Sequence, residues 1–240
     1  MSPHDPLVYL KTLLSKDFEA HKYKSSKEKP RAKEPLVITL SRDYGALGEE
    51  IARELASCLG IPVYDQEVID RVAKASKTDK FYVEQHDERS QAGVSGFLYS
   101  LISGTTSTVQ GYRRALFDVV LDLARSDCLI VGRGAHLILK NKKVFRLRVV
   151  GSREACAARV VAAEGLSLEA AEAKVHEVNN KRHKAINTLY EHQFEGSTLE
   201  HAVNFDLVIN TDHFTAQGAA LIVIMALEQA GYDLQRTERA

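Results

Sequence analysis

The chain has 240 residues, of which 45% are hydrophobic and 27% are charged, an ordinary balance for a globular protein. Lys plus Arg and Asp plus Glu each number 32, so the net charge is near zero and gives no general reason to expect binding to nucleic acid or to an anionic membrane. The three cysteines are far apart and show no metal-ligand or redox spacing, so we expect reduced thiols and no metal site.

The first 35 residues differ from the rest of the chain. A helical stripe of apolar residues is followed by the lysine-rich stretch HKYKSSKEKPRAKEP at 21–35, which contains two prolines. We expect residues 1–35 to form a helix on a basic linker, able to dock a protein partner or a second copy of the chain in a homodimer. The start lacks the basic-then-apolar order of a signal peptide, and the longest apolar run, at 219–227, is too short to span a bilayer. These features predict a cytoplasmic protein with no membrane segment.

From Leu36 onward, short apolar runs alternate with helical patterns. Strands are predicted at 36–40, 61–65, 128–132, 144–151 and 205–210. Helices are predicted at 49–59, where Gly60 ends the helix, and at 67–75, 115–124, 153–164, 167–192 and 215–230. The stretch 90–111 is rich in Gly, Ser and Thr and is expected to be a flexible loop or a substrate lid. The alternation predicts an α/β fold with a parallel sheet covered on both faces.

The segment 41–50 follows the first of these strands and opens a helix. Phosphate groups bind at such places, because the first backbone N–H groups of a helix and its dipole attract anions. The usual P-loop has the pattern G-x-x-x-x-G-K-[ST]. This chain has Gly45-Ala46-Leu47-Gly48-Glu49-Glu50 instead, without the lysine or the Ser/Thr hydroxyl that ends the usual pattern. Two acidic residues suit the helix dipole but repel a phosphate beside them. Taken alone, the segment is either a modified phosphate loop or a simple corner of the fold.

The stretch ITLSRDYGALGEEIARELASCLGIPVYDQEVI resembles the cytidylate kinase-like family, relatives of bacterial CMP kinases. The resemblance continues in LIVGRGAHLIL, VFRLRVVGSREACAARV, VNNKRHKAINTLYEHQF and FDLVINT, and it covers about residues 36–230. It implies a three-layer P-loop kinase fold with a five-stranded parallel sheet and a helical lid. The domain would span 36–232, with an acceptor-binding insert at about 66–112, a lid at about 153–195 and a tail at 233–240.

The same resemblance implies an activity and its substrates. It implies ATP-dependent phosphoryl transfer, with Mg²⁺, to a nucleoside monophosphate, with CMP or dCMP as acceptor. It gives Asp65 a contact to the acceptor's sugar, and it gives Arg71 and Arg133 contacts to the acceptor's phosphate. Arg133 stands between two glycines at a strand end, where backbone and guanidinium can approach a ligand closely.

Three arginines are candidates for the cations that stabilise the transition state. Arg159 and Arg182 lie in the lid segment, and Arg42 could replace the missing lysine. The residues expected to form the nucleotide phosphate loop are Ser41, Arg42, Gly45, Ala46, Gly48, Glu49 and Glu50.

Several positions depart from the pattern of that family. Related kinases carry an arginine near 156 and an aspartate at 179, where this chain has Cys156 and Asn179. They usually carry Ser, Gly and a basic residue where this chain has Ala46, Leu47 and Glu49. Two alternatives therefore remain open: a catalytically degenerate nucleotide-binding module that acts through protein partners, and a kinase for another small phosphorylated acceptor.

Overall fold

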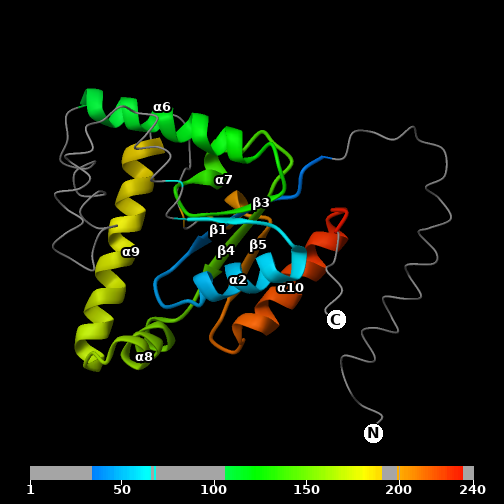
Figure 1. The fold of residues 1–240 in the computed structure, drawn as a ribbon. Coiled ribbons are helices and arrows are strands. Elements are labelled where there is room, and N and C mark those ends of the chain that lie inside the picture. The colour runs from blue at the N-terminus through cyan, green and yellow to red at the C-terminus, as the bar shows by residue number, and fades with distance from the viewer. Residues whose placement is uncertain (1–33, 66–67, 69–105, 191–198, 200, 235–240) are drawn as a thin grey trace, which may run out of the picture. The chain divides into compact units, whose positions relative to one another are not determined.

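Five parallel strands form the central sheet of the computed structural model, which describes residues 34–65, 68, 106–190, 199 and 201–234 (Figure 1). The strands are β1 (Val37–Arg42), β2 (Val63–Tyr64), β3 (Cys128–Val131), β4 (Phe145–Val150) and β5 (Leu207–Asn210). Their order is β2-β3-β1-β4-β5, and every neighbouring pair is parallel. The predicted five-stranded parallel sheet is therefore confirmed, with β1 at its centre.

The helices of the described residues are α2 (Gly48–Leu59), α6 (Thr106–Leu123), α7 (Ala135–Ile138), α8 (Arg153–Glu164), α9 (Leu168–Tyr190) and α10 (Ala216–Gln229), with a short 3₁₀ turn, η1 (Ala202–Asn204). Helix α6 begins nine residues before the predicted start, so the prediction of a loop is wrong for residues 106–111. Packing of the later turns of α6 in the core outweighs the weak helix propensity of the Ser and Thr residues at its start. The predicted helix at 67–75 and the remainder of the loop, 90–105, lie outside the described residues, apart from residue 68.

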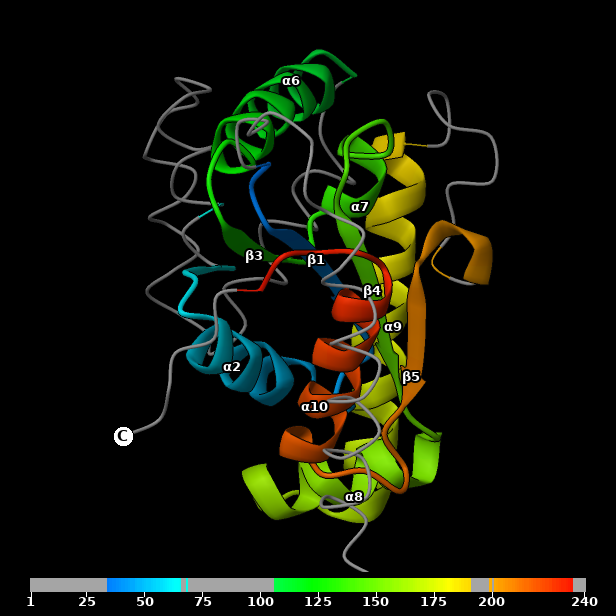
Figure 2. The same cartoon turned by 90° about the vertical axis from the view of Figure 1, so that its right-hand side faces the viewer.

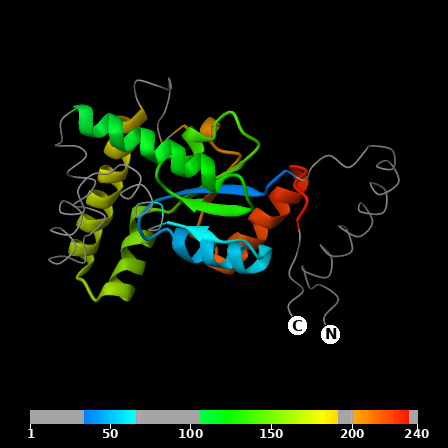
Figure 3. The same cartoon turned by 45° about the horizontal axis from the view of Figure 1, so that its top comes forward.

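The sheet separates two hydrophobic cores because successive strand residues face opposite sides. Ile38 and Leu40 pack with α2 and α10, whereas Val37 packs with α6 and α7. Helices α2 and α10 lie on one face of the sheet, and α6 and α7 lie on the other (Figures 1 and 3). This layering confirms the predicted α/β architecture. None of the described helices is long and apolar enough to cross a membrane.

Helices α8 and α9, joined by residues 165–167, form what we call the α8–α9 hairpin. Ala171 and Val175, near the start of α9, belong to the core that contains α2 and α10. Ile186 and Leu189, near its end, belong to the core that contains α6 and α7. Since α9 contributes to both cores, its middle passes the edge of the sheet, beside the connection from β1 to α2 (Figures 1 and 2).

Capping residues define two helix ends, and the predicted end at Gly60 is confirmed. Helix α2 stops at Gly60, whose φ of 66° is the left-handed conformation that glycine adopts readily. Helix α8 begins after Ser152, whose hydroxyl accepts a hydrogen bond from the Ala155 N–H at 3.2 Å.

A buried histidine, His136 of α7, lies on the face of the sheet that α6 and α7 cover. His136 is 2% exposed, and its Nδ1 is 3.3 Å from the Ser41 hydroxyl. Burial, together with the positive charges of Arg148 and Arg146, lowers the pKa of His136 to about 3. The imidazole therefore stays neutral in the folded protein at any pH near neutrality.

The protein is expected to lose stability as the pH falls below about 6.5, the ordinary histidine value. The unfolded chain takes up a proton at residue 136 there, whereas the folded chain does so only near pH 3. This group therefore lowers the free energy of unfolding by up to about 1.4 kcal/mol per pH unit between these values. We expect the free energy of unfolding, measured with urea at pH 7, 6 and 5, to fall less steeply with decreasing pH in His136→Asn than in wild type. His213 is exposed, so His213→Asn should show the same pH dependence of the free energy of unfolding as wild type. The same pH dependence in all three proteins would contradict the role given to His136.

Candidate functional site

The β1–α2 loop, residues 43–47, joins the central strand to the start of α2. Gly45 has a φ of 77°, and a Cβ added there would lie 2.7 Å from the carbonyl oxygen of Cys156 on α8. Leu47 precedes α2 with a left-handed φ of 62°, which costs a residue with a side chain about 1 kcal/mol. Leu47 makes no side-chain cap, so the start of α2 is not capped by the residue that precedes it.

Arg42, the last residue of β1, lies at the N-terminal end of α2. Its Nε and Nη2 are each 2.8 Å from Oε1 of Glu49, and its Nη2 is 3.2 Å from Oδ2 of Asp65. A Cβ on Gly48 would lie 2.5 Å from both Cβ and Cγ of Arg42, and one on Gly132 would lie 2.7 Å from its Nη1. The two glycines therefore make room for this arginine.

Arg182 reaches the same place from the middle of α9. Its Nη1 donates to the carbonyl oxygen of Arg42 at 3.0 Å, and its Nη2 is 3.8 Å from Oε1 of Glu49. Burial and the charge of Arg42 together lower the pKa of Arg182 to about 10, so the guanidinium is still charged at neutral pH. Arg42, Glu49, Asp65 and Arg182 together form what we call the Arg42 cluster.

Glu49 acts as the internal anion of this cluster. Burial alone would raise the pKa of Glu49, but the charges of Arg42 and Arg182 outweigh burial and hold the pKa below its usual value. One carboxylate oxygen thus accepts from one arginine and is ion-paired with a second, in the first turn of α2. Two guanidinium groups at a helix N-terminus suit an anion, and here the Glu49 carboxylate lies between them.

The α8–α9 hairpin is fastened to the β1–α2 loop. The backbone N–H of Tyr44 donates to Oδ1 of Asn179 at 2.8 Å. An asparagine keeps an acceptor oxygen where related kinases carry an aspartate, so this departure removes a charge but not the hydrogen bond.

Arg159 supports the loop from α8. Its Nη1 donates to the carbonyl oxygen of Gly45 at 3.2 Å and to Oγ1 of Thr211 at 3.1 Å, and its Nη2 donates to the carbonyl oxygen of Thr211 at 2.6 Å. Cys156, one turn earlier, is 1% exposed, and burial raises the pKa of its thiol to about 11. The structure thus places Cys156 in the core, and Arg159 bonds to backbone at the loop.

Arg133 follows β3 at the same edge of the sheet. Its φ is 57°, and the flanking Gly132 and Gly134 have φ values of 73° and 66°. Tyr190 donates its phenol hydrogen to the Arg133 carbonyl at 2.7 Å, and a Cβ on Gly134 would lie 2.3 Å from the Tyr190 ring. A strained, tightly packed turn of this kind is typical of ligand-binding strand ends.

The other predicted site residues lie apart from the cluster or outside the described residues. Ser41 is buried and faces His136, and Ala46 is buried with its carbonyl oxygen 3.1 Å from Oγ1 of Thr211. Glu50 is exposed and pairs with Arg53 at 3.7 Å. Arg71 lies outside the described residues. The structure therefore joins Arg42, Glu49, Asp65 and Arg182, while Tyr44 is a contact that sequence reasoning did not identify.

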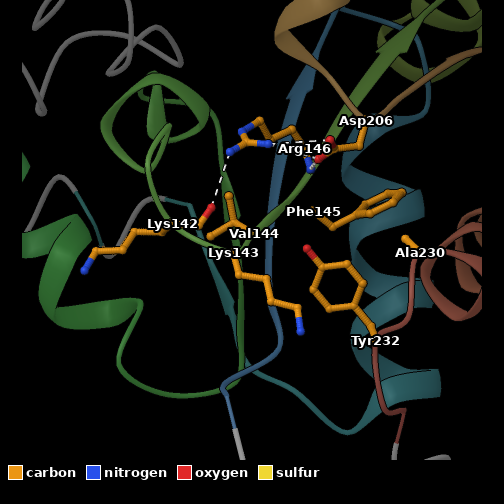
Figure 4. Close-up of a pocket in the computed structure, with 8 residues that line it drawn as sticks. All are labelled: Lys142, Lys143, Val144, Phe145, Arg146, Asp206, Ala230 and Tyr232. Atoms are coloured by element: carbon orange, nitrogen blue, oxygen red, sulfur yellow. Dashed lines mark hydrogen bonds and ion pairs between the residues drawn. The ribbon is translucent and has the colours of Figure 1, made fainter.

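A pocket of about 300 Å³ lies at the opposite edge of the sheet, where β4 begins (Figure 4). Its lining residues are Lys142, Lys143, Val144, Phe145, Arg146, Asp206, Ala230 and Tyr232. The Arg146 guanidinium is 3.3 Å from Asp206 and donates to the Lys140 carbonyl at 2.9 Å, so its donors are engaged. Ligands of parallel α/β sheets bind at the carboxyl ends of the strands, so the Arg42 cluster is the better candidate.

Within the part of the chain that the structure describes, no group of three or more His, Cys, Asp or Glu side chains could hold a metal ion. Mg²⁺ prefers oxygen ligands, and the Asp65 carboxylate, which is 38% exposed, is a ligand of that type.

Comparison with solved structures agrees with the fold. An uncharacterized protein from Eubacterium ventriosum has a TM-score of 0.62 and 20% identity, covering 81% of this chain and 98% of that one. Shikimate kinase from Acinetobacter baumannii, in complex with shikimate, has a TM-score of 0.46 and 16% identity, covering 84% and 97%. APS kinase from Mycobacterium tuberculosis, in complex with AMPPNP and APS, has a TM-score of 0.45 and 18% identity, covering 82% and 99%.

A family model gives the more specific result. No curated protein matches the chain. The model of the cytidylate kinase-like family matches residues 37–213, which include all five strands and the Arg42 cluster. This chain is a member of the cytidylate kinase-like family.

Proposed function

We propose that this protein transfers a phosphoryl group from ATP, as its Mg²⁺ complex, to a nucleoside monophosphate, with CMP or dCMP as the preferred acceptor, in the cytoplasm. One observation carries the proposal. Arg42 and Arg182 converge on one carboxylate oxygen of Glu49 in the first turn of α2, where a phosphate oxygen would bind.

In this proposal the phosphates of ATP displace Glu49 from the two arginines. Arg42 then substitutes for the P-loop lysine, supplying two donors in a planar fork, and Arg182 neutralises charge from the α9 side. Arg159 contributes by holding the Gly45 carbonyl, which fixes the loop, and its further role as a catalytic cation is part of the proposal. Charge stabilisation of this kind is the main contribution of a protein to phosphoryl transfer.

The acceptor would bind at the neighbouring strand ends. Arg133, and Arg71 from the insert at about 66–112, would contact the acceptor's phosphate. Asp65, now 3.2 Å from Arg42, would contact its sugar once ATP has engaged Arg42. Mg²⁺ would arrive with the phosphates of ATP and neutralise part of their charge, with Asp65 as the nearby carboxylate.

The proposal is tested by measuring phosphoryl transfer from ATP with Mg²⁺ to a panel of nucleoside monophosphates, CMP and dCMP included, and to other small phosphorylated acceptors. We expect CMP or dCMP to give the highest kcat/KM, and we expect transfer to be lost in Arg133→Ala. If phosphoryl transfer occurs only to a different acceptor, the proposed acceptor is wrong and the proposed reaction class stands. If the protein transfers phosphate to none of these acceptors, the proposed kinase activity is contradicted.

A second candidate function is a nucleotide-binding module without turnover, acting through a protein partner or a homodimer contact made by residues 1–35. The Glu49 carboxylate favours it, since this side chain must leave before a phosphate can reach the arginines. Nucleotide binding without phosphoryl transfer in the same panel would select this candidate.

Glu49→Gln is expected to raise the affinity for ATP about tenfold, since the change removes an anion that competes with phosphate for two charged donors. The measurement is calorimetric titration with ATP and Mg²⁺. Glu50→Gln is the matched control, because Glu50 is the neighbouring acidic residue and pairs with the exposed Arg53, 3.7 Å away. It should change the affinity less than about twofold. An unchanged or lower affinity in Glu49→Gln would contradict the role of Glu49 as a competing anion.

A further inference from the structure

Tyr44 is the residue through which the β1–α2 loop contacts the α8–α9 hairpin. Its backbone N–H donates to Oδ1 of Asn179 at 2.8 Å, and its phenol hydroxyl donates to the carboxylate of Glu164 at the end of α8. Its ring lies beside two cations of α9: Cζ of Arg182 is 5.8 Å and Nζ of Lys174 is 5.6 Å from the ring centroid. Backbone, ring and hydroxyl thus each have a partner in the hairpin.

The Tyr44 hydroxyl makes its contact at the protein surface, whereas the ring makes its contact with Arg182 deeper in the protein. Glu164 also pairs with Lys174, and both of these side chains are about one-third exposed, so this part of the contact is at the surface. The ring contact with Arg182 is deeper, because the Arg182 side chain is 21% exposed and also donates to the Arg42 carbonyl. The ring is therefore the part of Tyr44 that bears on the Arg42 cluster.

Arg182 is held at three points. The Arg42 carbonyl fixes one nitrogen at 3.0 Å, Glu49 attracts another at 3.8 Å, and the Tyr44 ring lies beside the guanidinium. When an incoming phosphate displaces Glu49, the carbonyl and the ring are the contacts that remain. A guanidinium that stays in place loses less conformational entropy when a phosphate binds.

We propose that Tyr44 is a positioning residue: its ring holds Arg182 against the β1–α2 loop so that the guanidinium is already placed for a phosphate. This inference rests on the proposed function of the Arg42 cluster. It also means that Tyr44 fastens the loop to the hairpin, since the same residue is bonded to Asn179 and to Glu164.

The ring and the hydroxyl can be separated by mutation. Tyr44→Ala removes the ring and the hydroxyl and keeps the backbone N–H, and it should lower the affinity for ATP with Mg²⁺ about five- to tenfold, the size of a partly buried cation–π contact and its ordering effect. Tyr44→Phe keeps the ring and should stay within about twofold of wild type. Tyr232→Ala, which removes a partly buried tyrosine at the opposite edge, controls for a general loss of packing and should leave the affinity unchanged.

The deciding experiment is a double-mutant cycle by calorimetric titration with ATP and Mg²⁺. If Tyr44 acts through Arg182, then Tyr44→Ala should cost less than about twofold in the Arg182→Ala background. The same five- to tenfold loss in both backgrounds would overturn the positioning role, as would a Tyr44→Phe variant as weak as Tyr44→Ala.

A hydrogen-exchange measurement separates this inference from the proposed function. Without ligand, Tyr44→Ala should speed amide exchange in residues 174–182 of α9 relative to wild type and to Tyr232→Ala. If wild type binds no ATP and this exchange still quickens, then the proposed function fails while the fastening of α9 by Tyr44 stands. Unchanged exchange in residues 174–182 would overturn the fastening itself.

Discussion

Replacing Arg42 with alanine is expected to lower the affinity for ATP with Mg²⁺ about a hundredfold. A hydrogen bond to a charged group contributes about 1.5–3 kcal/mol, and two such bonds from one guanidinium to phosphate exceed the roughly 2.8 kcal/mol that a hundredfold change requires. The change also leaves Glu49 with Arg182 as its remaining cation in the cluster, so the carboxylate repels the incoming phosphate more strongly. Calorimetric titration measures the affinity, and the transfer assay should show at least the same loss in kcat/KM.

Two controls sharpen this prediction. Arg42→Lys keeps the charge and loses the planar fork, so its affinity should fall between those of wild type and Arg42→Ala. Arg53→Ala removes an arginine on the same helix whose side chain is 73% exposed, and it should change the affinity less than about twofold. Equal losses in Arg42→Ala and Arg53→Ala would mean that net charge, rather than the geometry of Arg42, attracts the nucleotide.

Replacing Asp43 with alanine is expected to lower the free energy of unfolding by about 3 kcal/mol, the lower end of the range for breaking a buried ion pair. Asp43 begins the β1–α2 loop, and its Oδ1 is 2.5 Å from Nη2 of Arg148 on β4. The Arg148 side chain is 6% exposed, so the alanine variant leaves a buried guanidinium without its carboxylate. Urea unfolding followed by circular dichroism measures the change.

The matched control is an exposed pair of the same residue types. Asp122→Ala removes the partner of Arg125 at 3.8 Å, where the side chains are 67% and 81% exposed, and should cost less than about 0.5 kcal/mol. The double variant Asp43→Ala/Arg148→Met should regain part of the loss, because it removes the unpaired charge as well. Similar costs for Asp43→Ala and Asp122→Ala would show that the Arg148 pair does not fasten the loop to β4.

The order of strands and helices could be predicted because it depends on local patterns. Apolar, β-branched runs gave β1 and β4, and Gly60 marked the end of α2. The predicted length of α6 was too short because its first turns are rich in Ser and Thr. Helix α7 has four residues, which are too few to show a periodic pattern in the sequence. The family resemblance supplied the P-loop kinase fold, which periodicity alone could not.

The partners of the site residues could not be predicted, because they depend on contacts far apart in the chain. Tyr44 and Asn179 are 135 positions apart, and Asp43 and Arg148 are 105 apart. An arginine pattern also leaves the direction of the side chain undetermined. Arg159 was expected to face phosphate, and in the structure its guanidinium bonds to the Gly45 and Thr211 carbonyls, so its catalytic role stays a prediction.

The structure explains two of the positions at which this chain departs from the family pattern. Asn179 was interpreted as a departure from the family, yet it accepts the loop N–H of Tyr44. Cys156 is a core residue whose carbonyl oxygen lies against Gly45, so a charged side chain at this position would be buried. The departure that bears on binding is Glu49, since it occupies the two arginines directly.

The most direct measurement is calorimetric titration of ATP with Mg²⁺ into wild type, the double variant Arg42→Ala/Arg182→Ala, and Arg53→Ala. If the Arg42 cluster is a phosphate site, wild type and Arg53→Ala bind one ATP per chain with a Kd below about 1 mM, and the double variant shows no measurable binding. Equal binding by wild type and the double variant, or no binding by wild type, would contradict it.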